Sequence, residues 1–273
     1  MEHSRRDFLK QSAGIALASP SLLTPASAPE TRTDHARVLR FAVASDGHFG
    51  QPKTDYQTFT RNVVDHLNAE KERSGLDLCF FNGDLIHDDP RFMPEVKTAF
   101  DRLTMPYYVT RGNHDMVSPE VWKQIWGYEE NHVVELDDCA FVLGNTSNPK
   151  GEYVCADPRW LGSALDKQRR KKHVFVLLHI PQRKWTANGI DCPAVMETIE
   201  RYPNVKAVFH GHEHDQDDVK VSGGKPYIFD GHFGGSWGTA YKGYRIVEVF
   251  ADGKISTYQF NPEVRPIVNA KAL

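Results

Sequence analysis

The sequence has few cysteines and no long hydrophobic run. Its four cysteines, Cys79, Cys139, Cys155 and Cys192, are too few and too irregularly spaced for a disulfide framework or a CxxC-type zinc site. No stretch approaches the roughly 18 uncharged apolar residues that a membrane-spanning helix needs, so we expect no transmembrane span. These shortages exclude a small disulfide-stabilised domain, a thiolate zinc module and an integral membrane protein.

Positive charge is not in excess either. The chain has 33 Lys and Arg residues against 36 Asp and Glu residues, which gives a formal net charge of -3. Proteins that grip a nucleic-acid backbone need a surplus of positive charge, so no specific nucleic-acid binding is expected. The sequence does have 13 histidines, and their positions carry the functional argument.

The N-terminal segment has the three parts of a bacterial export signal. Arg5 and Arg6 form a basic beginning, residues 14–18 are apolar, and residues 26–28 are small. The paired arginines predict a signal of the twin-arginine type, and therefore the twin-arginine export machinery as a partner.

This signal predicts how the chain is divided. We expect residues 1–28 to be the export signal, residues 29–37 a linker and residues 38–273 one domain that is periplasmic or extracellular. Pairing of Cys139 with Cys155 after export stays open, because the sequence does not show whether their α-carbons come within bonding range.

Beyond residue 38, short apolar runs alternate with longer stretches of helical spacing, which predicts an α/β architecture. The expected strands are 38–45, 76–81, 106–110, 133–136, 140–143, 173–178, 205–209, 227–229, 244–250 and 255–260. The expected helices are 56–72, 94–103, 119–126 with Ser118 as its cap, 158–172 and 193–201.

Several of these strands end in side chains of the kind that bind metal ions. Ligands of open α/β sheets bind beyond the carboxyl ends of the strands, so these ends can converge on one rim. The rim would offer seven donors without a thiolate: Asp46, His48, Asp84, Asn113, His179, His212 and His214. Carboxylate, amide and imidazole ligands suit Mn, Fe or Zn, and seven donors suit two divalent ions better than one tetrahedral ion.

Taken one at a time, these residues have ordinary alternatives. An isolated Asp or Asn at a strand end is most often a turn residue, and a lone histidine such as His179 is most often a packing residue. The ordered set of motifs favours the metal site over these alternatives.

The motifs Asp46-x-His48, Gly83-Asp84, Gly112-Asn113-His114-Asp115, His179 and Gly211-His212-x-His214 resemble those of calcineurin-like metallophosphoesterases. The resemblance runs from residue 38 to about residue 250. It implies a four-layer α/β/β/α sandwich of two mixed sheets. It also implies that Asp46, His48 and His214 hold one ion, that Asn113, His179 and His212 hold the other, and that Asp84 bridges them.

The same resemblance implies a phosphoesterase in which a hydroxide held between the ions attacks the phosphate ester. His114 would protonate the leaving oxygen, and Asp115 would orient its ring. The expected substrate is a small phosphodiester; a phosphomonoester, or a non-catalytic metal-binding scaffold, is the alternative. Residues 87–89, which follow Asp84, are expected to form a solvated loop; the alternative is that they support the ion that Asp84 holds.

Residues near the predicted rim are candidates for substrate contact. Arg111, Arg183 and His232 are the three candidates. The alternatives are a surface salt bridge for Arg111, a solvated loop for Arg183, and a turn residue or a support of the metal ligands for His232. Trp185 and Trp237 either stack on a nucleobase or serve as lid or packing residues.

Overall fold

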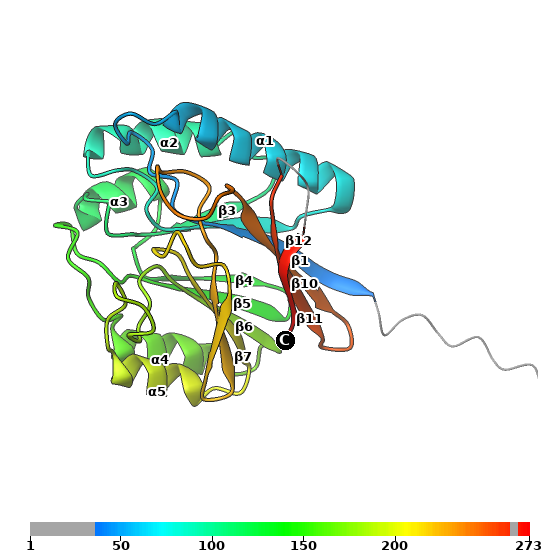
Figure 1. Cartoon of the computed structure of the whole chain (residues 1–273). Coiled ribbons are helices and arrows are strands. Elements are labelled where there is room, and N and C mark those ends of the chain that lie inside the picture. Colours follow the sequence, from blue (N-terminus) through cyan, green and yellow to red (C-terminus); the bar gives the residue numbers. More distant parts are fainter. Residues whose placement is uncertain (1–35, 263–266) are drawn as a thin grey trace, which may run out of the picture. The chain divides into compact units, whose positions relative to one another are not determined.

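The structure is a computed structural model that describes residues 36–262 and 267–273 (Figure 1). The predicted export signal, residues 1–28, and nearly all of the predicted linker lie outside the described residues, so both stay predictions. Within the described ranges, no helix combines the length and the apolar character that crossing a membrane requires.

Two mixed six-stranded sheets form the centre of the domain. The first has the strand order β12-β11-β10-β1-β2-β3 and the second the order β4-β5-β6-β7-β9-β8. The first sheet contains β1 (Arg37–Ala44), β2 (Leu78–Asn82), β3 (Tyr107–Thr110), β10 (Tyr244–Phe250), β11 (Ile255–Phe260) and β12 (Ile267–Ala272). The second contains β4 (His132–Leu136), β5 (Cys139–Gly144), β6 (His173–Leu178), β7 (Val205–His210), β8 (Val219–Ser222) and β9 (Lys225–Phe229).

Helices cover the outer face of each sheet, which confirms the expected four-layer α/β/β/α sandwich (Figure 1). The helices are α1 (Tyr56–Ser74), α2 (Met93–Phe100), α3 (Pro119–Trp126), α4 (Pro158–Lys167) and α5 (Pro193–Glu200), with a short 3₁₀ helix η1 (Pro90–Phe92) before α2. The first three pack on the first sheet and α4 and α5 on the second. The cap at Ser118 is confirmed, because its side chain accepts a hydrogen bond from the Val121 N–H.

Aromatic side chains fill the space between the two sheets. The ring of Phe41 lies 5.0 Å from the rings of both Phe141 and Phe175, and Phe80 lies 4.6 Å from Phe141. Burying a side chain of this size stabilises the fold by about 1.5–3 kcal/mol. These rings hold the two sheets face to face, and so hold together the strand ends that each sheet contributes to the candidate site.

Parallel strands place the motif-bearing loops at corresponding edges of the two sheets. In the first sheet β1, β2 and β3 are parallel neighbours, joined through α1 and α2. In the second, β5, β6 and β7 are parallel neighbours, joined through α4 and α5. The loops that leave these strands carry the predicted donors.

The strand and helix predictions are confirmed with two kinds of difference. The helix expected to run to residue 172 ends at Lys167, because the Gln168 N–H bonds to both Ala164 and Leu165 in a tightened last turn. Strands β8 and β12 were not expected, since each is a short edge strand with exposed or half-exposed residues and a weak apolar pattern.

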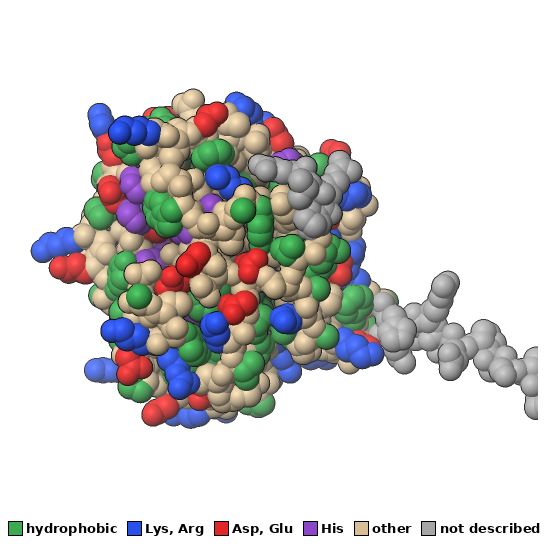
Figure 2. Space-filling view, in the orientation of Figure 1, with side chains coloured by type: hydrophobic (Ala, Val, Ile, Leu, Met, Phe, Trp, Pro, Cys, Tyr) green, Lys and Arg blue, Asp and Glu red, His purple; other side chains and the backbone are tan. Residues whose placement is uncertain are grey.

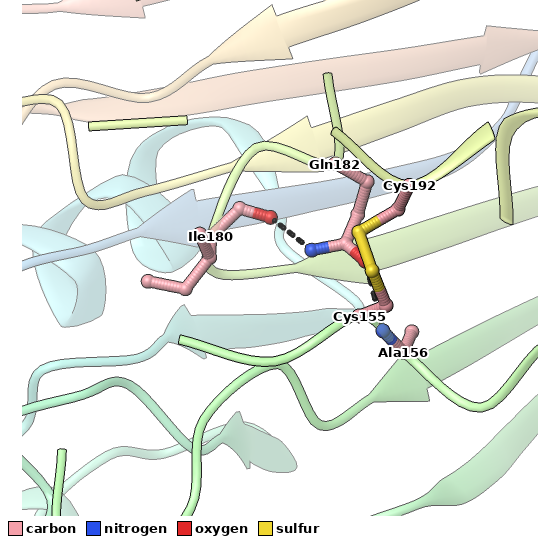
Figure 3. Close-up of a disulfide and its surroundings, with 5 residues drawn as sticks. All are labelled: Cys155, Ala156, Ile180, Gln182 and Cys192. Carbon is pink, nitrogen blue, oxygen red and sulfur yellow. Dashed lines mark hydrogen bonds between the residues drawn. A yellow bond between two sulfur atoms is a disulfide. The ribbon is translucent and has the colours of Figure 1, made fainter. Parts of the chain in front are cut away.

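The open pairing of Cys139 with Cys155 is corrected by the structure. Cys155 forms a disulfide with Cys192, 37 residues away, whereas Cys139 and Cys79 are free and buried (Figure 3). Cys139 opens β5, while Cys155 lies in the loop after its carboxyl end, so the length of the strand separates them. The disulfide joins the loop after β5 to the loop after β6, beside a hydrogen bond from the Ala156 N–H to Gln182.

Removing this disulfide should destabilise the domain. The free energy of unfolding of the double variant Cys155→Ala/Cys192→Ala should be about 2–4 kcal/mol lower than that of the wild type, because the disulfide no longer restricts the unfolded chain. Urea denaturation measures this difference. Cys139→Ala, which removes a free buried thiol, is the matched control, and its stability should fall by less than that of the double variant. A double variant as stable as the wild type would contradict the disulfide.

Candidate metal centre

The backbone turns sharply where the donor-bearing loops leave the strands. Asp46, His48, Asp84 and His212 all have positive φ angles, of 58°, 47°, 51° and 69°. This left-handed conformation is uncommon for residues other than glycine, and costs roughly 1–3 kcal/mol at each position. The surrounding structure, and not local preference, therefore fixes the directions of these four side chains.

Two glycines allow the loops to meet at close range. A Cβ atom on Gly112 would lie 2.1 Å from the backbone nitrogen of Asp84, and one on Gly211 would lie 1.9 Å from Ser45 Oγ. Any side chain there would separate the loops. This close approach is the physical reason for glycine before Asn113 and before His212.

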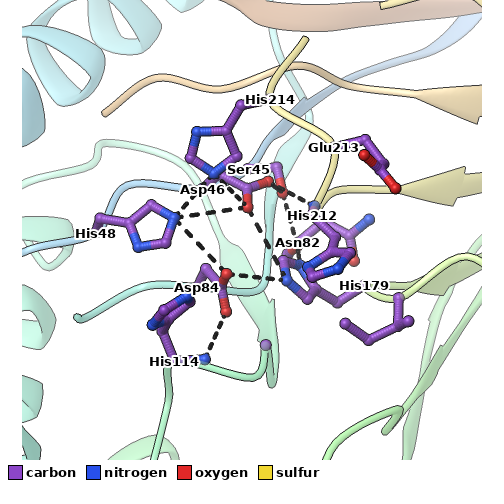
Figure 4. Close-up of polar contacts among 12 residues, drawn as sticks. Ser45, Asp46, His48, Asn82, Asp84, His114, His179, His212, Glu213 and His214 are labelled. Atoms are coloured by element: carbon purple, nitrogen blue, oxygen red, sulfur yellow. Dashed lines mark hydrogen bonds and ion pairs between the residues drawn. The ribbon is translucent and has the colours of Figure 1, made fainter. Parts of the chain in front are cut away.

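Asp46, His48 and His214 form the first group of donors (Figure 4). All three are buried, and their ligand atoms lie within 4.8 Å of one another. His48 Nε2 is 2.9 Å from His214 Nε2, which in turn is 3.1 Å from Asp46 Oδ1. Two residues come from the loop after β1 and one from the loop after β7, so the group spans both sheets.

Asp84, His179 and His212 form the second group. His179 Nε2 lies 3.2 Å from Asp84 Oδ2, and the same oxygen lies 3.7 Å from His48 Nε2 in the first group. Asp84 is thus the carboxylate between the two groups, where the sequence analysis expected a bridging ligand. Asn113, the seventh expected donor, is buried in the loop after β3.

The unpaired atoms of these residues fit bound cations. Asn113 Oδ1 and His212 Nε2 are buried and make no hydrogen bond, and Asp46 Oδ1 and His179 Nε2 contact only other donors of the two groups. An unsatisfied buried polar atom costs about 1–3 kcal/mol. Carboxylate, amide and imidazole donors converging in this way suit divalent transition-metal ions, and their division into two groups linked by Asp84 suits two of them.

The electrostatics of the two groups lead to the same conclusion. Burial alone would raise the pKa of Asp46, but the neighbouring His214 and His179 outweigh it, and the pKa is lowered. Burial alone would lower the pKa of His179, but Asp84 and Asp46 outweigh it, and that pKa is raised. The two buried carboxylates therefore require positive charge beside them, which either a protonated imidazole or a metal ion supplies.

Hydrogen bonds outside the donor groups fix the orientation of the donors. Ser45 Oγ lies 2.5 Å from Asp46 Oδ2, and His179 Nδ1 lies 2.7 Å from the Asn82 carbonyl oxygen (Figure 4). With Nδ1 bonded to a carbonyl group, the ring of His179 turns Nε2 toward the centre. Sequence reasoning missed Ser45 and Asn82; their one signal is their position directly before the Asp46 and Gly83 motifs.

His114 lies beside the donors, and its ring is oriented by a residue that the sequence analysis did not select. Its backbone N–H donates to Asp84 Oδ1 at 2.8 Å, and its ring Nδ1 lies 2.7 Å from Asp88 Oδ1. The ring also stacks on His87 at 4.7 Å, and His87 Nδ1 is 3.0 Å from His48 Nδ1. The loop at residues 87–89 thus contacts both a donor and His114, which favours the supporting role over a merely solvated loop.

Asp115 does not have the expected role of orienting the His114 ring. It is buried, and its two carboxylate oxygens accept hydrogen bonds from the backbone N–H groups of Ile86 and Gly112 at 3.0 and 2.8 Å. Burial, and then the negative charge of Asp84, raise the pKa of Asp115 to about 7. Asp115 therefore holds two donor-bearing loops together, and Asp88 takes the position expected of it.

Arg111 and Arg183, two of the expected substrate contacts, have different surroundings in the structure. Arg111 is fully buried and forms an ion pair with Glu130, so its charge is satisfied inside the protein. Arg183 is exposed, but its guanidinium donates to Ser222 Oγ on β8 at 2.8 Å. The expected contact of Arg111 is corrected, because this side chain is buried beside an acidic one. The expected contact of Arg183 stays a prediction, since the side chain is exposed.

His232 is close to the centre but buried behind it. Its ring stacks on His214 with centroids 5.0 Å apart, and its Nδ1 bonds to the Gly234 carbonyl oxygen. The expected substrate contact is corrected here as well, because His232 supports a donor from the side away from solvent.

In the space-filling view, several histidine side chains reach the surface close together, with acidic and hydrophobic side chains beside them (Figure 2). A solute can therefore approach this cluster from outside.

Comparisons with known proteins agree with this site. Residues 39–216 match the model of the calcineurin-like phosphoesterase family, and the chain belongs to that family. The matched segment contains all seven expected donors and His114.

Two curated relatives are similar over much of their length. A probable glycerophosphodiester phosphodiesterase of Arcobacter nitrofigilis is 26% identical over 189 residues, which cover 63% of this chain and 68% of the relative. A 3′,5′-cyclic-nucleotide phosphodiesterase of Nostoc sp. is 24% identical over 229 residues, which cover 73% of this chain and 83% of the relative.

Solved structures share the fold. A dimetal phosphatase from Danio rerio superposes with a TM-score of 0.69 at 13% identity and covers 87% of this chain and 99% of its own. A purple acid phosphatase from yellow lupin superposes with a TM-score of 0.64 at 10% identity, and the match covers 86% of this chain and 53% of the lupin protein. Family and site together define a metal-dependent phosphoesterase, a hydrolase.

The two aspartates near His114 should respond differently to the same substitution. Asp88→Asn should lower phosphoesterase turnover and leave stability unchanged, because Asp88 contacts the exposed side of the His114 ring. Asp115→Asn should lower the free energy of unfolding by about 1–3 kcal/mol, since an amide leaves one buried N–H without an acceptor. Paired urea denaturation and steady-state kinetics test this; equal loss of turnover without loss of stability in both variants would restore Asp115 as the orienting residue.

Proposed function

We propose that the protein hydrolyses a small phosphodiester with the help of two divalent ions of Mn, Fe or Zn. The observation that carries this proposal is the position of Asp84, whose Oδ2 lies within 4 Å of an imidazole nitrogen in each donor group while Oδ1 accepts the His114 N–H. The names of the two curated relatives, both phosphodiesterases, support a diester over a monoester.

The residues present supply the parts that this reaction needs. The two ions would supply positive charge to the phosphate oxygens and activate the attacking water. The protein's own proton donor is His114, which is partly exposed and lies 4.8 Å, ring to ring, from the donor His48. With Nδ1 held by Asp88, the other ring nitrogen is available to protonate the departing alkoxide, a contribution of about 10²–10⁴-fold.

The hydrolysis of chromogenic esters by metal-loaded protein tests the proposal. Bis(p-nitrophenyl) phosphate should be cleaved more efficiently than p-nitrophenyl phosphate with manganese present. Cleavage of the monoester alone would favour the phosphomonoesterase alternative. Bound metal without hydrolysis of either ester would favour the non-catalytic scaffold.

Two variants separate metal binding from proton donation. His114→Ala should lower kcat by about 10²–10⁴-fold and retain the metals, because His114 donates a proton and holds no ion. Asp84→Ala should lower both kcat and metal content, since it removes the carboxylate between the two groups. Elemental analysis of each variant checks the metal; loss of metal from His114→Ala would contradict the division of roles.

We also propose that the protein is exported to the periplasm or beyond through residues 1–28. The Cys155–Cys192 disulfide supports this, because disulfides persist in oxidising compartments and are rare in the cytosol. Arg5→Lys/Arg6→Lys should keep the protein in the cytoplasmic fraction, measured by immunoblotting of cell fractions. Unchanged export of this variant would exclude the twin-arginine route.

A further inference from the structure

Exposed aromatic side chains are rare in the described part of the chain, and they gather at the metal centre. Seven large apolar side chains are exposed there, of which only Tyr153 and Trp237 are aromatic, with 40% and 46% of their surface accessible. Each packs on a histidine of a different donor group. Large exposed aromatic surface beside a reaction centre marks a contact site for a ligand.

Trp237 lies against the first donor group. Its ring stacks on His214 with centroids 4.3 Å apart and planes 7° apart, and it lies 5.0 Å from the ring of His48. Its backbone carbonyl oxygen lies 3.2 Å from His214 Nδ1, so the backbone of Trp237 is fixed by the donor itself. Nearly half of the side chain nevertheless stays accessible after this stacking.

Tyr153 lies against the second donor group. Its ring meets His212 edge to face, with centroids 4.7 Å apart and planes 84° apart. The loop that carries Tyr153 is fixed on two sides. On one side, Ser147 forms an isolated β-bridge with Tyr153, and its hydroxyl group donates to the Gly112 carbonyl oxygen. On the other side, Cys155 forms the disulfide with Cys192. The position of Tyr153 relative to the centre is therefore built into the fold.

The two aromatic side chains thus flank the carboxylate that links the donor groups, one beside each group. A phosphomonoester has one organic substituent and would contact one of them. A phosphodiester has two substituents on its phosphorus and can contact both. Planar or apolar substituents gain most from such contacts, because aromatic faces bind flat rings and hydrocarbon surface.

We propose that Trp237 and Tyr153 are specificity-determining residues that contact the two ester substituents of a phosphodiester, each substituent planar or apolar. This inference rests on the proposed diesterase function. Trp237 contacts the leaving group, since it lies near His48 and His87, the same rings on which His114 packs. Tyr153 contacts the substituent that is retained, on the side of His179 and His212.

The bond changes follow from this placement. A water oxygen bonds to phosphorus, and the phosphorus–oxygen bond on the Trp237 side breaks. The departing alkoxide takes a proton from His114, and the water's proton passes to solvent. The product beside Tyr153 is a phosphomonoester that keeps the second substituent.

Two diesters with the same leaving group separate the two contacts. Bis(p-nitrophenyl) phosphate retains an aryl group after cleavage, whereas methyl p-nitrophenyl phosphate retains a methyl group. Tyr153→Ala should lower kcat/KM for the first by about tenfold and leave the second nearly unchanged, because only the aryl group reaches Tyr153. Trp237→Ala should lower kcat/KM for both by a similar factor. Tyr153→Phe and Trp237→Phe should restore most of each loss.

Binding without turnover gives an independent measurement. In zinc-loaded His114→Ala protein, calorimetry should show diphenyl phosphate binding about tenfold more tightly than dimethyl phosphate. Adding Tyr153→Ala to that protein should abolish the difference. Val221→Ala, at an exposed apolar residue on β8, is the matched control. It should change neither the kcat/KM values for the two diesters nor the difference in affinity between diphenyl and dimethyl phosphate.

The outcomes distinguish this inference from the proposed function. If metal-loaded wild type cleaves neither diester, the diesterase proposal fails and the inference fails with it. If it cleaves both diesters, but Tyr153→Ala and Trp237→Ala behave like Val221→Ala, the diesterase proposal stands and the aromatic contacts are excluded.

Discussion

The structure depends on keeping two negative charges, those of Asp46 and Asp84, buried where the two sheets meet. A buried carboxylate is costly unless positive charge lies beside it, and here imidazoles from the opposite sheet provide donors that converge on the same points. The left-handed backbone at both aspartates and the glycines that let the loops meet serve this arrangement. The aromatic layer between the sheets keeps the two sets of loops in register. Asp84 is the central element, because it lies between both donor groups and also holds the backbone of His114.

Much of the fold follows from patterns that the sequence displays openly. The apolar runs of β1, β6 and β10 are long and fully buried for most of their length, so their periodicity is unambiguous. One proline in the first turn and a side-chain cap mark where α3 begins. The donors could be anticipated for a similar reason: each follows a strand directly, and a parallel sheet brings such positions to one edge.

The remaining features depend on long-range geometry that no local pattern encodes. Asp115 follows His114 in sequence, yet its side chain points to Ile86 and Gly112, while Asp88, 26 residues away from His114, reaches the ring. Arg111 precedes the same motif, yet its side chain is buried in an ion pair with Glu130. The partner of Cys155 depends on how the loops after β5 and β6 approach each other. Adjacency along the chain is a poor guide wherever a sharp turn sends consecutive side chains in opposite directions.

The donors of each group come from distant parts of the chain: His48 and His214, for example, are 166 residues apart. An unfolded chain holds no such cluster, so ions that occupy these positions recognise only the native state. Loading and folding are consequently linked equilibria, and the concentration of free metal enters the stability of the protein by mass action. Each ion would also act as a reversible cross-link between the sheets, at the end of the sandwich where the hydrophobic layer gives way to charge. A low concentration of free metal would therefore lower both the hydrolytic activity and the stability of the fold.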